Sequence, residues 1–183
     1  MRFNLIVAMC RDNGIGYKGK LPWHIPQDLE YFSKITKGEG LNAVIMGNNT
    51  WQSLPIPKNN VRGLVKRDNF ILSRTDQFDM LINHDRLIKT FPTIHALEEY
   101  VENNTYEEVW VIGGAQIYKQ FLDLKKIQRC YVTYIDADFD CDVFFPIMDS
   151  TEWKEVERTD KYSTEYDCNV RYIVYEYSED LIL

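Results

Sequence analysis

The stretch EEVWVIGGAQIYKQFL (residues 107–122) joins an apolar run, two glycines and a segment with helical spacing. Residues 109–112 predict a strand that is buried on both faces, because the run is continuous rather than alternating. Gly113 and Gly114 end the strand, and residues 115–122 predict a helix. In this arrangement, bare backbone at a helix N-terminus can approach a phosphate. A tight turn without a ligand explains the two glycines equally well, so the spacing alone does not decide between a phosphate site and a turn.

Other apolar runs and helical patterns extend the same organisation along the chain. The predicted strands cover residues 3–10, 42–47, 69–74, 79–83, 129–139, 151–159 and 170–177. Further helices are predicted from Pro26, over the short turn 48–54, and over 93–103 with Thr93 as N-cap. Strands alternate with helices to about residue 125 and then dominate. This order predicts a three-layer α/β sandwich, whose central, mostly parallel sheet of about eight strands has an antiparallel C-terminal edge and helices on both faces.

The composition is that of a single soluble domain. The chain has 183 residues and a net charge of −7, with no repeat or long linker, so residues 1–183 are expected to form one domain. The acidic balance argues against nucleic acid or an anionic membrane as a partner. No apolar run approaches the ~20 residues that cross a bilayer. The four cysteines form no C-x-x-C pair and the three histidines are scattered, so no metal site is expected. Free thiols and a cytoplasmic location are favoured.

The hexapeptide GIGYKG (14–19) matches the pattern G-x-G-x-x-G directly after a predicted strand. The dinucleotide-binding fingerprint requires a helix to begin at this point. Here the chain continues into KLPWHIP (20–26), where two prolines allow a helix to begin only around Pro26. We therefore interpret the hexapeptide as a glycine-rich mobile loop over a cleft. Gly113 and Gly114 are better placed for a phosphate, and MGNNTW (46–51) repeats their arrangement of a strand end, a glycine and a short helix. Both would lie at the same carboxyl edge of the sheet.

The helix that begins near Pro26 has an acid on its apolar face. Asp28, Phe32 and Ile35 are spaced i, i+4 and i+7, and Leu29 widens this face. A carboxylate on an apolar face costs roughly several kcal/mol unless it is paired. Burial also raises its pKa. From the residues alone, an acid that faces solvent is the alternative.

Together, and in this order, the motifs resemble those of the dihydrofolate reductase family. The resemblance is carried by LIVAMCRDNGIGYKGKLPW, AVIMGNNTWQSLP, FILSR, VWVIGGAQIY, YVTYIDADFDCDVFFP and YEY. It implies the sandwich fold predicted above and the reduction of 7,8-dihydrofolate to tetrahydrofolate. In this reaction a hydride moves from NADPH to C6 and a proton is added at N5.

The resemblance also implies roles for individual residues. Asp28 would pair with N3 and the 2-amino group of the pterin and supply the proton, by polarising the pterin and an ordered water that Trp23 holds. Thr133 would donate its hydroxyl to this carboxylate, and Arg67 would bind the α-carboxylate of the substrate's glutamate. Backbone carbonyls or apolar side chains would form the rest of the substrate site, with core packing as the alternative for the leucines and phenylalanine: Ile6, Val7, Ala8, Leu29, Phe32, Leu54, Leu64 and Ile112.

For NADPH, the resemblance implies contacts along the carboxyl edge of the sheet and a cis peptide bond between Gly113 and Gly114. Ser73 and Arg74 would meet the 2′-phosphate. The full expected set is Ala8, Ile15, Gly16, Lys20, Leu21, Gly47, Asn48, Asn49, Thr50, Leu72, Ser73, Arg74, Ile112, Gly113, Gly114, Ala115, Gln116, Ile117 and Tyr118. Asn48 and Asn49 depart from the family pattern, which usually has basic residues after Gly47. We therefore expect a narrower preference for NADPH over NADH than is usual in the family.

Two further implications concern loops and partners. Asp142 is expected to bind the backbone of the mobile loop around residues 14–16, with an exposed turn aspartate as the alternative. The expected partner is the small-molecule substrate, and a monomer is expected unless the chain is part of a thymidylate synthase fusion.

Two other functions are compatible with parts of the pattern. One is a reductase of the same fold that acts on a ribosylamino-pyrimidine in riboflavin synthesis, but that branch lacks an acid at the position of Asp28 and the LPW motif. The other is a non-catalytic folate or nucleotide binder. The presence of Asp28, Trp23, Thr133, Arg67 and the glycine pair argues against both.

Overall fold

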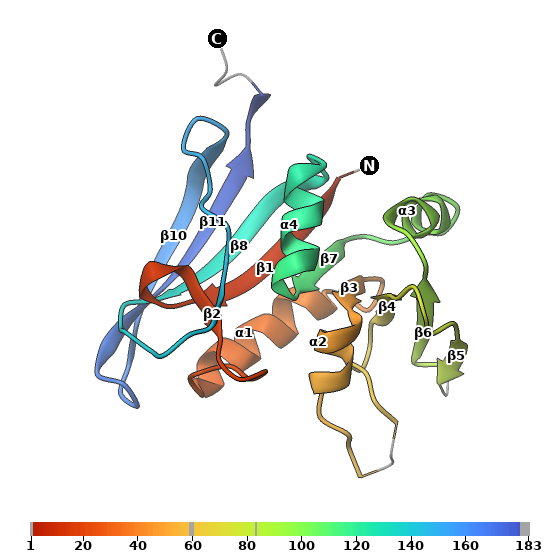
Figure 1. Ribbon diagram of the computed structural model, residues 1–183, viewed down its shortest axis with the longest axis horizontal. Helices are drawn as coiled ribbons and strands as arrows, with labels where there is room; N and C mark the ends of the chain where they lie inside the picture. Colours follow the sequence, from red (N-terminus) through yellow and green to blue (C-terminus); the bar gives the residue numbers. More distant parts are fainter. Residues whose placement is uncertain (1, 59–60, 83, 180–183) are drawn as a thin grey trace.

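A large central sheet organises the molecule (Figure 1), and the computed structural model describes residues 2–58, 61–82 and 84–179. Within these residues, nine strands form one sheet in the order β10-β11-β8-β1-β7-β3-β4-β6-β5. Their bounds are β1 (Phe3–Met9), β3 (Ala43–Gly47), β4 (Asp68–Leu72), β5 (Asp79–Ile82), β6 (Arg86–Phe91), β7 (Val109–Gly113), β8 (Ile127–Ile135), β10 (Trp153–Ser163) and β11 (Cys168–Tyr177). A separate small sheet pairs β2 (Gly14–Gly16) with β9 (Val143–Phe144).

The middle of the sheet is parallel and both of its edges are antiparallel. All neighbouring pairs from β8 through β1, β7, β3 and β4 to β6 are parallel. The strands β11 and β10 add an antiparallel C-terminal edge, which confirms that part of the prediction. The opposite edge is also antiparallel, because β5 forms a hairpin with β6. That second antiparallel edge was not predicted.

Helices cover both faces of the sheet, so the predicted three-layer sandwich is confirmed. The helices α1 (Pro26–Lys37) and α2 (Asn48–Ser53) cover one face, and α3 (Ile94–Glu102) and α4 (Ala115–Asp123) cover the other (Figure 1). A short 3₁₀ turn, Arg11–Asn13, follows β1. The predicted N-cap of α3 is present, since the hydroxyl of Thr93 accepts a hydrogen bond of 3.1 Å from the amide of Ala96.

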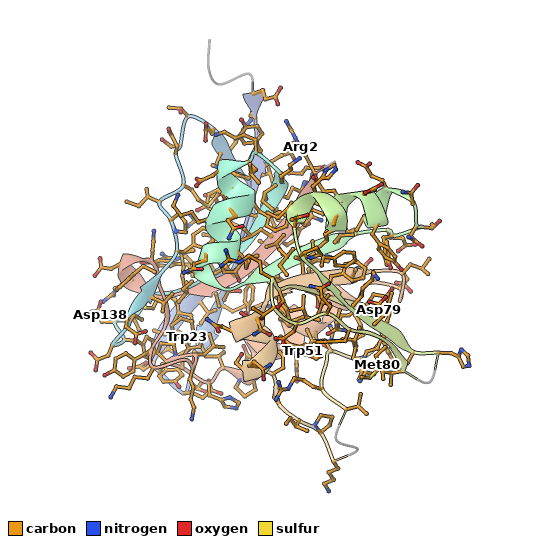
Figure 2. All side chains as sticks on the ribbon, turned by 45° about the vertical axis from the view of Figure 1, so that its right-hand side comes forward. Arg2, Trp23, Trp51, Asp79, Met80 and Asp138 are labelled. Carbon is orange, nitrogen blue, oxygen red and sulfur yellow. The ribbon has the colours of Figure 1, made fainter. Side chains whose placement is uncertain are left out.

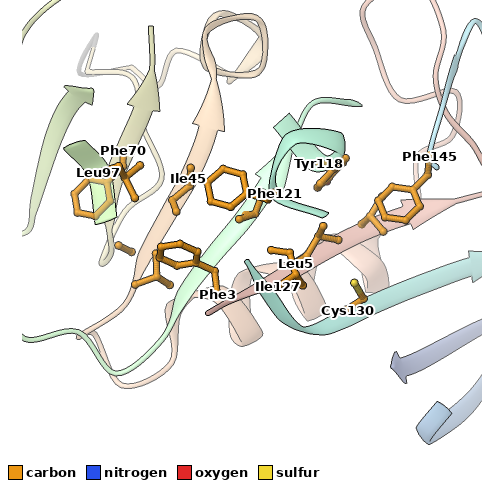
Figure 3. Close-up of a cluster of buried hydrophobic side chains, with 14 of the residues drawn as sticks. Phe3, Leu5, Ile45, Phe70, Leu97, Tyr118, Phe121, Ile127, Cys130 and Phe145 are labelled. Carbon is orange, nitrogen blue, oxygen red and sulfur yellow. The ribbon is translucent and has the colours of Figure 1, made fainter. Parts of the chain in front are cut away.

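The face under α3 and α4 is the main apolar core (Figure 3). Every second residue of β1 points into it, as strand geometry requires, and these are Phe3, Leu5, Val7 and Met9. The ring of Phe3 meets that of Phe121 edge-on with centroids 5.5 Å apart. Aromatic rings prefer this geometry to face-to-face stacking.

The sequence prediction missed the strand β6. Its sequence RLIKTF begins with Arg86 and contains Lys89, so it lacks the continuous apolar run of the other buried strands. Its burial comes from its position between β4 and β5 rather than from its composition. Arg86 is 4% exposed there and is paired with Asp85.

Several predicted boundaries were also wrong. The strand predicted over 129–139 ends as β8 at Ile135, where its pairing with β11 also ends, at Val170. The strand predicted over 151–159 continues to Ser163, in spite of its many charged residues, because it lies at the solvent-exposed edge of the sheet. The last residue of the strand predicted over 79–83 lies outside the described residues.

Candidate active site

The sheet opens at its carboxyl edge between β1 and β7. These parallel strands are paired at Asn4 with Trp110 and at Leu5 with Val111, and no further pairing follows. Beyond that point the hydroxyl of Tyr118 lies between the strands, 2.8 Å from the carbonyl oxygens of both Ile6 and Ile112. From β1 the chain crosses to β3, which lies beyond β7 in the sheet. From β7 it crosses in the opposite direction to β8, which lies beyond β1. Such a reversal of direction is where open α/β sheets bind ligands.

Asp28 lies beside this opening, in the first turn of α1. Pro26 is tolerated at the start of the helix because the first turn has no hydrogen bond for its missing N–H. The carboxylate is 9% exposed, and the hydroxyl of Thr133 on β8 donates a hydrogen bond of 2.7 Å to it. This predicted hydrogen bond is confirmed. Burial raises the pKa of Asp28, and the hydrogen bond from Thr133 opposes part of that increase.

Apolar side chains surround this carboxylate on the same face of the sheet. Strand alternation turns Ile6 and Ala8 toward α1, and several of the predicted substrate residues pack on this face: Phe32, Leu54, Leu64 and Ile112. The side chain of Val7 points into the opposite core, so only the backbone of this residue can face a ligand here. Leu29 is 47% exposed and therefore does not belong to the core.

Arg67 is a buried cation at the far side of α1. It is 4% exposed, and its Nη1 donates to the hydroxyl of Thr36 at 2.8 Å and to the carbonyl of Ser33 at 3.2 Å. Its Nε has no hydrogen-bond partner in the described chain. Burial, with a smaller contribution from Arg86, lowers the pKa of Arg67 to about 10. A buried guanidinium with an unpaired donor is suited to an anionic ligand.

Sequence reasoning missed the residues that hold Arg67 in place. Thr36 is fully buried, accepts from Arg67 and donates to the carbonyl of Phe32 at 2.8 Å. Asn69 is also fully buried, and its amide binds the carbonyls of Leu64 and Arg67, both at 2.9 Å. A signal was present, because both are polar residues within segments predicted to pack against the core.

Trp23 follows the glycine-rich loop and is 5% exposed, with its ring edge-on to Phe139. Its indole Nε1 has no hydrogen-bond partner within the described residues. Figure 2 shows Trp23 and Trp51 of α2 at the same end of the molecule, opposite Arg2. A buried donor of this kind indicates a polar group, such as a water or a ligand atom, on that side.

The glycines at the ends of β3 and β7, Gly47 and Gly113, lie where the neighbouring side chains leave little room for a Cβ atom. The peptide bond between Gly113 and Gly114 is cis, as expected. A Cβ atom on Gly47 would lie 2.9 Å from Cγ1 of Ile117, and one on Gly113 would lie 3.2 Å from the ring of Tyr118. Gly114 is the N-cap of α4 and provides no side chain, so the first amides of the helix are open to a ligand.

The other residues expected at the cofactor site lie in several environments. Ile15, Leu72 and Ile117 pack on the α3/α4 face of the sheet, whereas the exposed residues of the set are Lys20, Leu21, Asn49, Arg74 and Gln116. Gly16, Asn48, Thr50 and Ala115 are half-buried.

Two residues of the expected cofactor set are already used within the protein. The hydroxyl of Ser73 accepts a hydrogen bond of 3.1 Å from the amide of Asp76, which closes the turn after β4. Tyr118 is buried beneath the strands at 5% exposure, and its hydroxyl lies against the carbonyls of Ile6 and Ile112. Sequence motifs could not distinguish such internal hydrogen bonds from ligand contacts.

The glycine-rich loop is attached to the segment before β9. The side chain of Asp142 accepts a hydrogen bond of 3.0 Å from the amide of Lys18. The amide of Asp142 donates to the carbonyl of Gly16 at 2.9 Å. The expected hydrogen bond between Asp142 and the loop backbone around residues 14–16 is therefore confirmed, and a second one joins Asp142 to Lys18.

The described residues contain neither a metal-binding cluster nor a membrane-spanning helix. No group of three or more His, Cys, Asp and Glu side chains there could hold a metal ion. No helix within residues 2–58, 61–82 and 84–179 has the length and apolar character needed to cross a membrane.

The fold and these residues define an α/β protein with a small-molecule site at the carboxyl edge of its sheet. A family model described as dihydrofolate reductase matches residues 2–177. The dihydrofolate reductase of Drosophila melanogaster is 40% identical over 152 residues, which are 81% of each chain. That of Pneumocystis carinii is 32% identical over 173 residues, 87% of this chain and 81% of its own. The chain belongs to the dihydrofolate reductase family.

A bifunctional relative matches the chain over part of its length. The bifunctional dihydrofolate reductase-thymidylate synthase of Daucus carota is 35% identical over 157 residues. These residues are 81% of this chain and 29% of the carrot protein.

Proposed function

We propose that the chain reduces 7,8-dihydrofolate to tetrahydrofolate, with a hydride from NADPH and a proton added at N5. The observation that carries the proposal is the buried carboxylate of Asp28, which is 9% exposed and has only the hydroxyl of Thr133 as a side-chain partner among the described residues. A flat heterocycle with adjacent ring and amino N–H groups would complete this partnership through two parallel hydrogen bonds.

Arg67 supports the choice of a substrate with an anionic tail. Its guanidinium is buried, and its Nε has no partner within the described chain. The apolar residues Phe32, Leu54 and Leu64 pack on the same face of the sheet. A pterin at Asp28, a benzoyl group along this apolar surface and a carboxylate at Arg67 would use each of these groups.

The backbone around the two glycine turns fits a nicotinamide dinucleotide. The absence of side chains at Gly113 and Gly114 leaves the start of α4 open to a pyrophosphate. When bound, the cofactor supplies the hydride for C6 of the substrate. The exposed Arg74 is suited to the 2′-phosphate, whereas Asn48 and Asn49 provide no charge there.

The chain itself contributes alignment, exclusion of water and a proton. Burial keeps the pKa of Asp28 raised, so the carboxyl group retains a proton at higher pH than an exposed aspartate. The unpaired Nε1 of Trp23 is suited to hold a water that passes this proton toward N5. The carbonyls of Ile6 and Ile112 border the opening between β1 and β7 and can orient the amino groups of the ring.

The decisive experiment measures NADPH oxidation in the presence of dihydrofolate by the purified chain. We expect turnover that depends on both compounds and is inhibited by a diaminopyrimidine antifolate. A folded protein that binds dihydrofolate without turnover would contradict the proposal and favour a folate binder. Turnover of a ribosylamino-pyrimidine instead of dihydrofolate would favour the related reductase of the same fold.

The same assay tests the cofactor preference. Because Asn48 and Asn49 are uncharged, we expect kcat/KM with NADPH to exceed that with NADH by less than about a thousandfold, or ~4 kcal/mol. A larger ratio would show that Arg74 is sufficient for the full preference.

A further inference from the structure

Two of the four thiols lie close together beside the glycine-rich loop. The sulfur atoms of Cys10 and Cys141 are 3.6 Å apart, although the residues are separated by 131 positions in the chain. Cys10 directly follows β1. Cys141 lies just before β9, and only Asp142 stands between Cys141 and this strand. Both are free thiols, with Cys10 buried and Cys141 half-buried. The proposed reaction uses neither of them.

Gly14, the first residue of the glycine-rich loop, lies against this pair. A Cβ atom on Gly14 would collide with the sulfur of Cys141 and would lie 2.9 Å from that of Cys10. The loop is already bonded to both flanking segments. The amide of Cys10 donates to the carbonyl of Gly14 at 3.0 Å, and the amide of Asp142 donates to the carbonyl of Gly16 at 2.9 Å.

We propose that Cys10 and Cys141 form a reversible disulfide that fixes the glycine-rich loop in its present conformation. A disulfide bond is ~2.05 Å long, so the sulfurs need to approach by about 1.5 Å. Cys141 lies in an irregular segment between β8 and β9, where rotation about its side-chain bonds and a small backbone shift can supply this movement.

The oxidant is a small disulfide such as oxidised glutathione. The thiolate of Cys141, the more exposed partner, attacks one sulfur of the small disulfide, forms a mixed disulfide and releases one small thiolate. The thiolate of Cys10 then attacks the sulfur of Cys141, the protein disulfide forms and the second small thiolate leaves. The two protons of the cysteines pass to the two released thiolates. The protein loses two electrons and the small disulfide gains them.

The local environment makes the first step slow and the second step favourable. Burial and the hydrogen bond with Cys10 raise the pKa of Cys141 to about 11, so few molecules have a reactive thiolate at neutral pH. Once the mixed disulfide exists, the sulfur of Cys10 is already a neighbour, and the closing step is intramolecular.

The consequence for activity rests on the proposed function. The glycine-rich loop leads through Lys20 and Leu21 to Trp23, which we place next to the reacting groups. A covalent link between Cys10 and Cys141 holds the loop against β9 and opposes its opening. We expect the oxidised enzyme to turn over several-fold more slowly, with dithiothreitol restoring the rate.

The test treats the purified full chain with oxidised glutathione at mildly alkaline pH, followed by intact mass and peptide mapping. We expect a mass decrease of about 2 Da and a Cys10–Cys141 linked peptide, in the wild type and in Cys168→Ser. Cys168 is the matched control because it lies in the same apolar cluster as Cys10. Cys10→Ala and Cys141→Ser should form no link. A stable glutathione adduct on Cys141, a Cys10–Cys168 link or an unchanged mass would each overturn the proposal.

The activity readout separates the two parts of the argument. A link that forms without slowing turnover would overturn the effect on the loop. If the reduced protein has no reductase activity, the proposed function fails, while the mass measurement still decides the disulfide. If oxidised glutathione slows Cys141→Ser as much as the wild type, the inhibition does not come from the Cys10–Cys141 bond and this part of the proposal is overturned.

Discussion

The two faces of the main sheet bury different kinds of groups. Under α3 and α4 the face is mainly apolar (Figure 3). It includes aromatic pairs such as Phe70 and Phe91, whose ring centroids are 5.3 Å apart. The face under α1 and α2 also has an apolar cluster, but the charged residues Asp28 and Arg67 are buried on this face as well. Burial of apolar surface stabilises a protein, whereas burial of a charge without a full set of partners destabilises it. The α3/α4 face therefore supplies stability, and the α1/α2 face retains charges that a ligand can satisfy.

The largest effect is expected from a substitution that removes the carboxylate of Asp28 from the α1/α2 face. Asp28→Asn should lower kcat/KM by about 10²–10⁴-fold, the usual contribution of a general acid. The raised pKa of Asp28 means that its stabilising contribution is complete at low pH and is lost as pH rises through that pKa. The free energy of unfolding at neutral pH should therefore not decrease in the variant. Steady-state kinetics and urea denaturation measure the two effects, and a variant that is both active and less stable would contradict the distinction between the faces.

The matched change on the other face is Leu97→Ala. Leu97 is fully buried in the α3/α4 core, so its truncation should lower the free energy of unfolding by about 2–5 kcal/mol. Activity per folded molecule should stay within about threefold of the wild type, because the cavity lies across the sheet from Asp28. Urea denaturation and kinetics at low temperature measure these effects. A large loss of kcat with normal stability would show that the two faces are coupled.

Arg67 provides an intermediate effect that depends on the substrate. Arg67→Ala removes a charge-assisted hydrogen bond, so KM for dihydrofolate should rise by roughly 10–100-fold, with a smaller change in kcat. With a reduced pterin that has no glutamate tail as the substrate, KM should change little in the variant, since this compound has no carboxylate for Arg67 to bind. Arg67→Lys keeps the charge without the planar fork and should recover part of the loss. Equal losses for both substrates would assign Arg67 a structural role only.

The smallest expected effect is a displaced pH profile in Thr133→Val. The hydrogen bond from Thr133 lowers the pKa of Asp28, in opposition to burial. Its removal should raise that pKa further. Because the protonated carboxyl group is the proton source in our proposal, the fall in kcat with rising pH should move to higher pH. An unchanged profile would mean that another step or group controls this fall.

Much of the fold followed from local patterns. Continuous apolar runs correctly predicted β1, β3, β4 and β7, because strands in the parallel part of the sheet are buried on both faces. The strand β6 could not be predicted in this way. Its Arg86 pairs with the preceding residue, Asp85, and its Lys89 pairs with Asp79 of the neighbouring strand β5. The second pairing joins two strands and is visible only in three dimensions.

The site could also be predicted only in part, because local patterns show some of its residues and not others. Asp28 stood out because an acid on an apolar helical face violates a local rule, and the hydrogen bond with Thr133 followed from the family resemblance. The partners of Arg67 on α1 and β4, and the proximity of Cys10 to Cys141, depend on long-range packing. No spacing in the sequence encodes these contacts.

The position of Tyr118 has a consequence for which rings the opening can accept. A phenol has one proton, yet its oxygen lies 2.8 Å from two carbonyl oxygens, those of Ile6 and Ile112. At any moment one of these carbonyls lacks the hydrogen bond from Tyr118. A ring that presents an N–H or amino group at this point gains a hydrogen bond, and a ring that presents a lone pair meets repulsion. We therefore expect the opening between β1 and β7 to distinguish tautomers and flipped orientations of the same heterocycle.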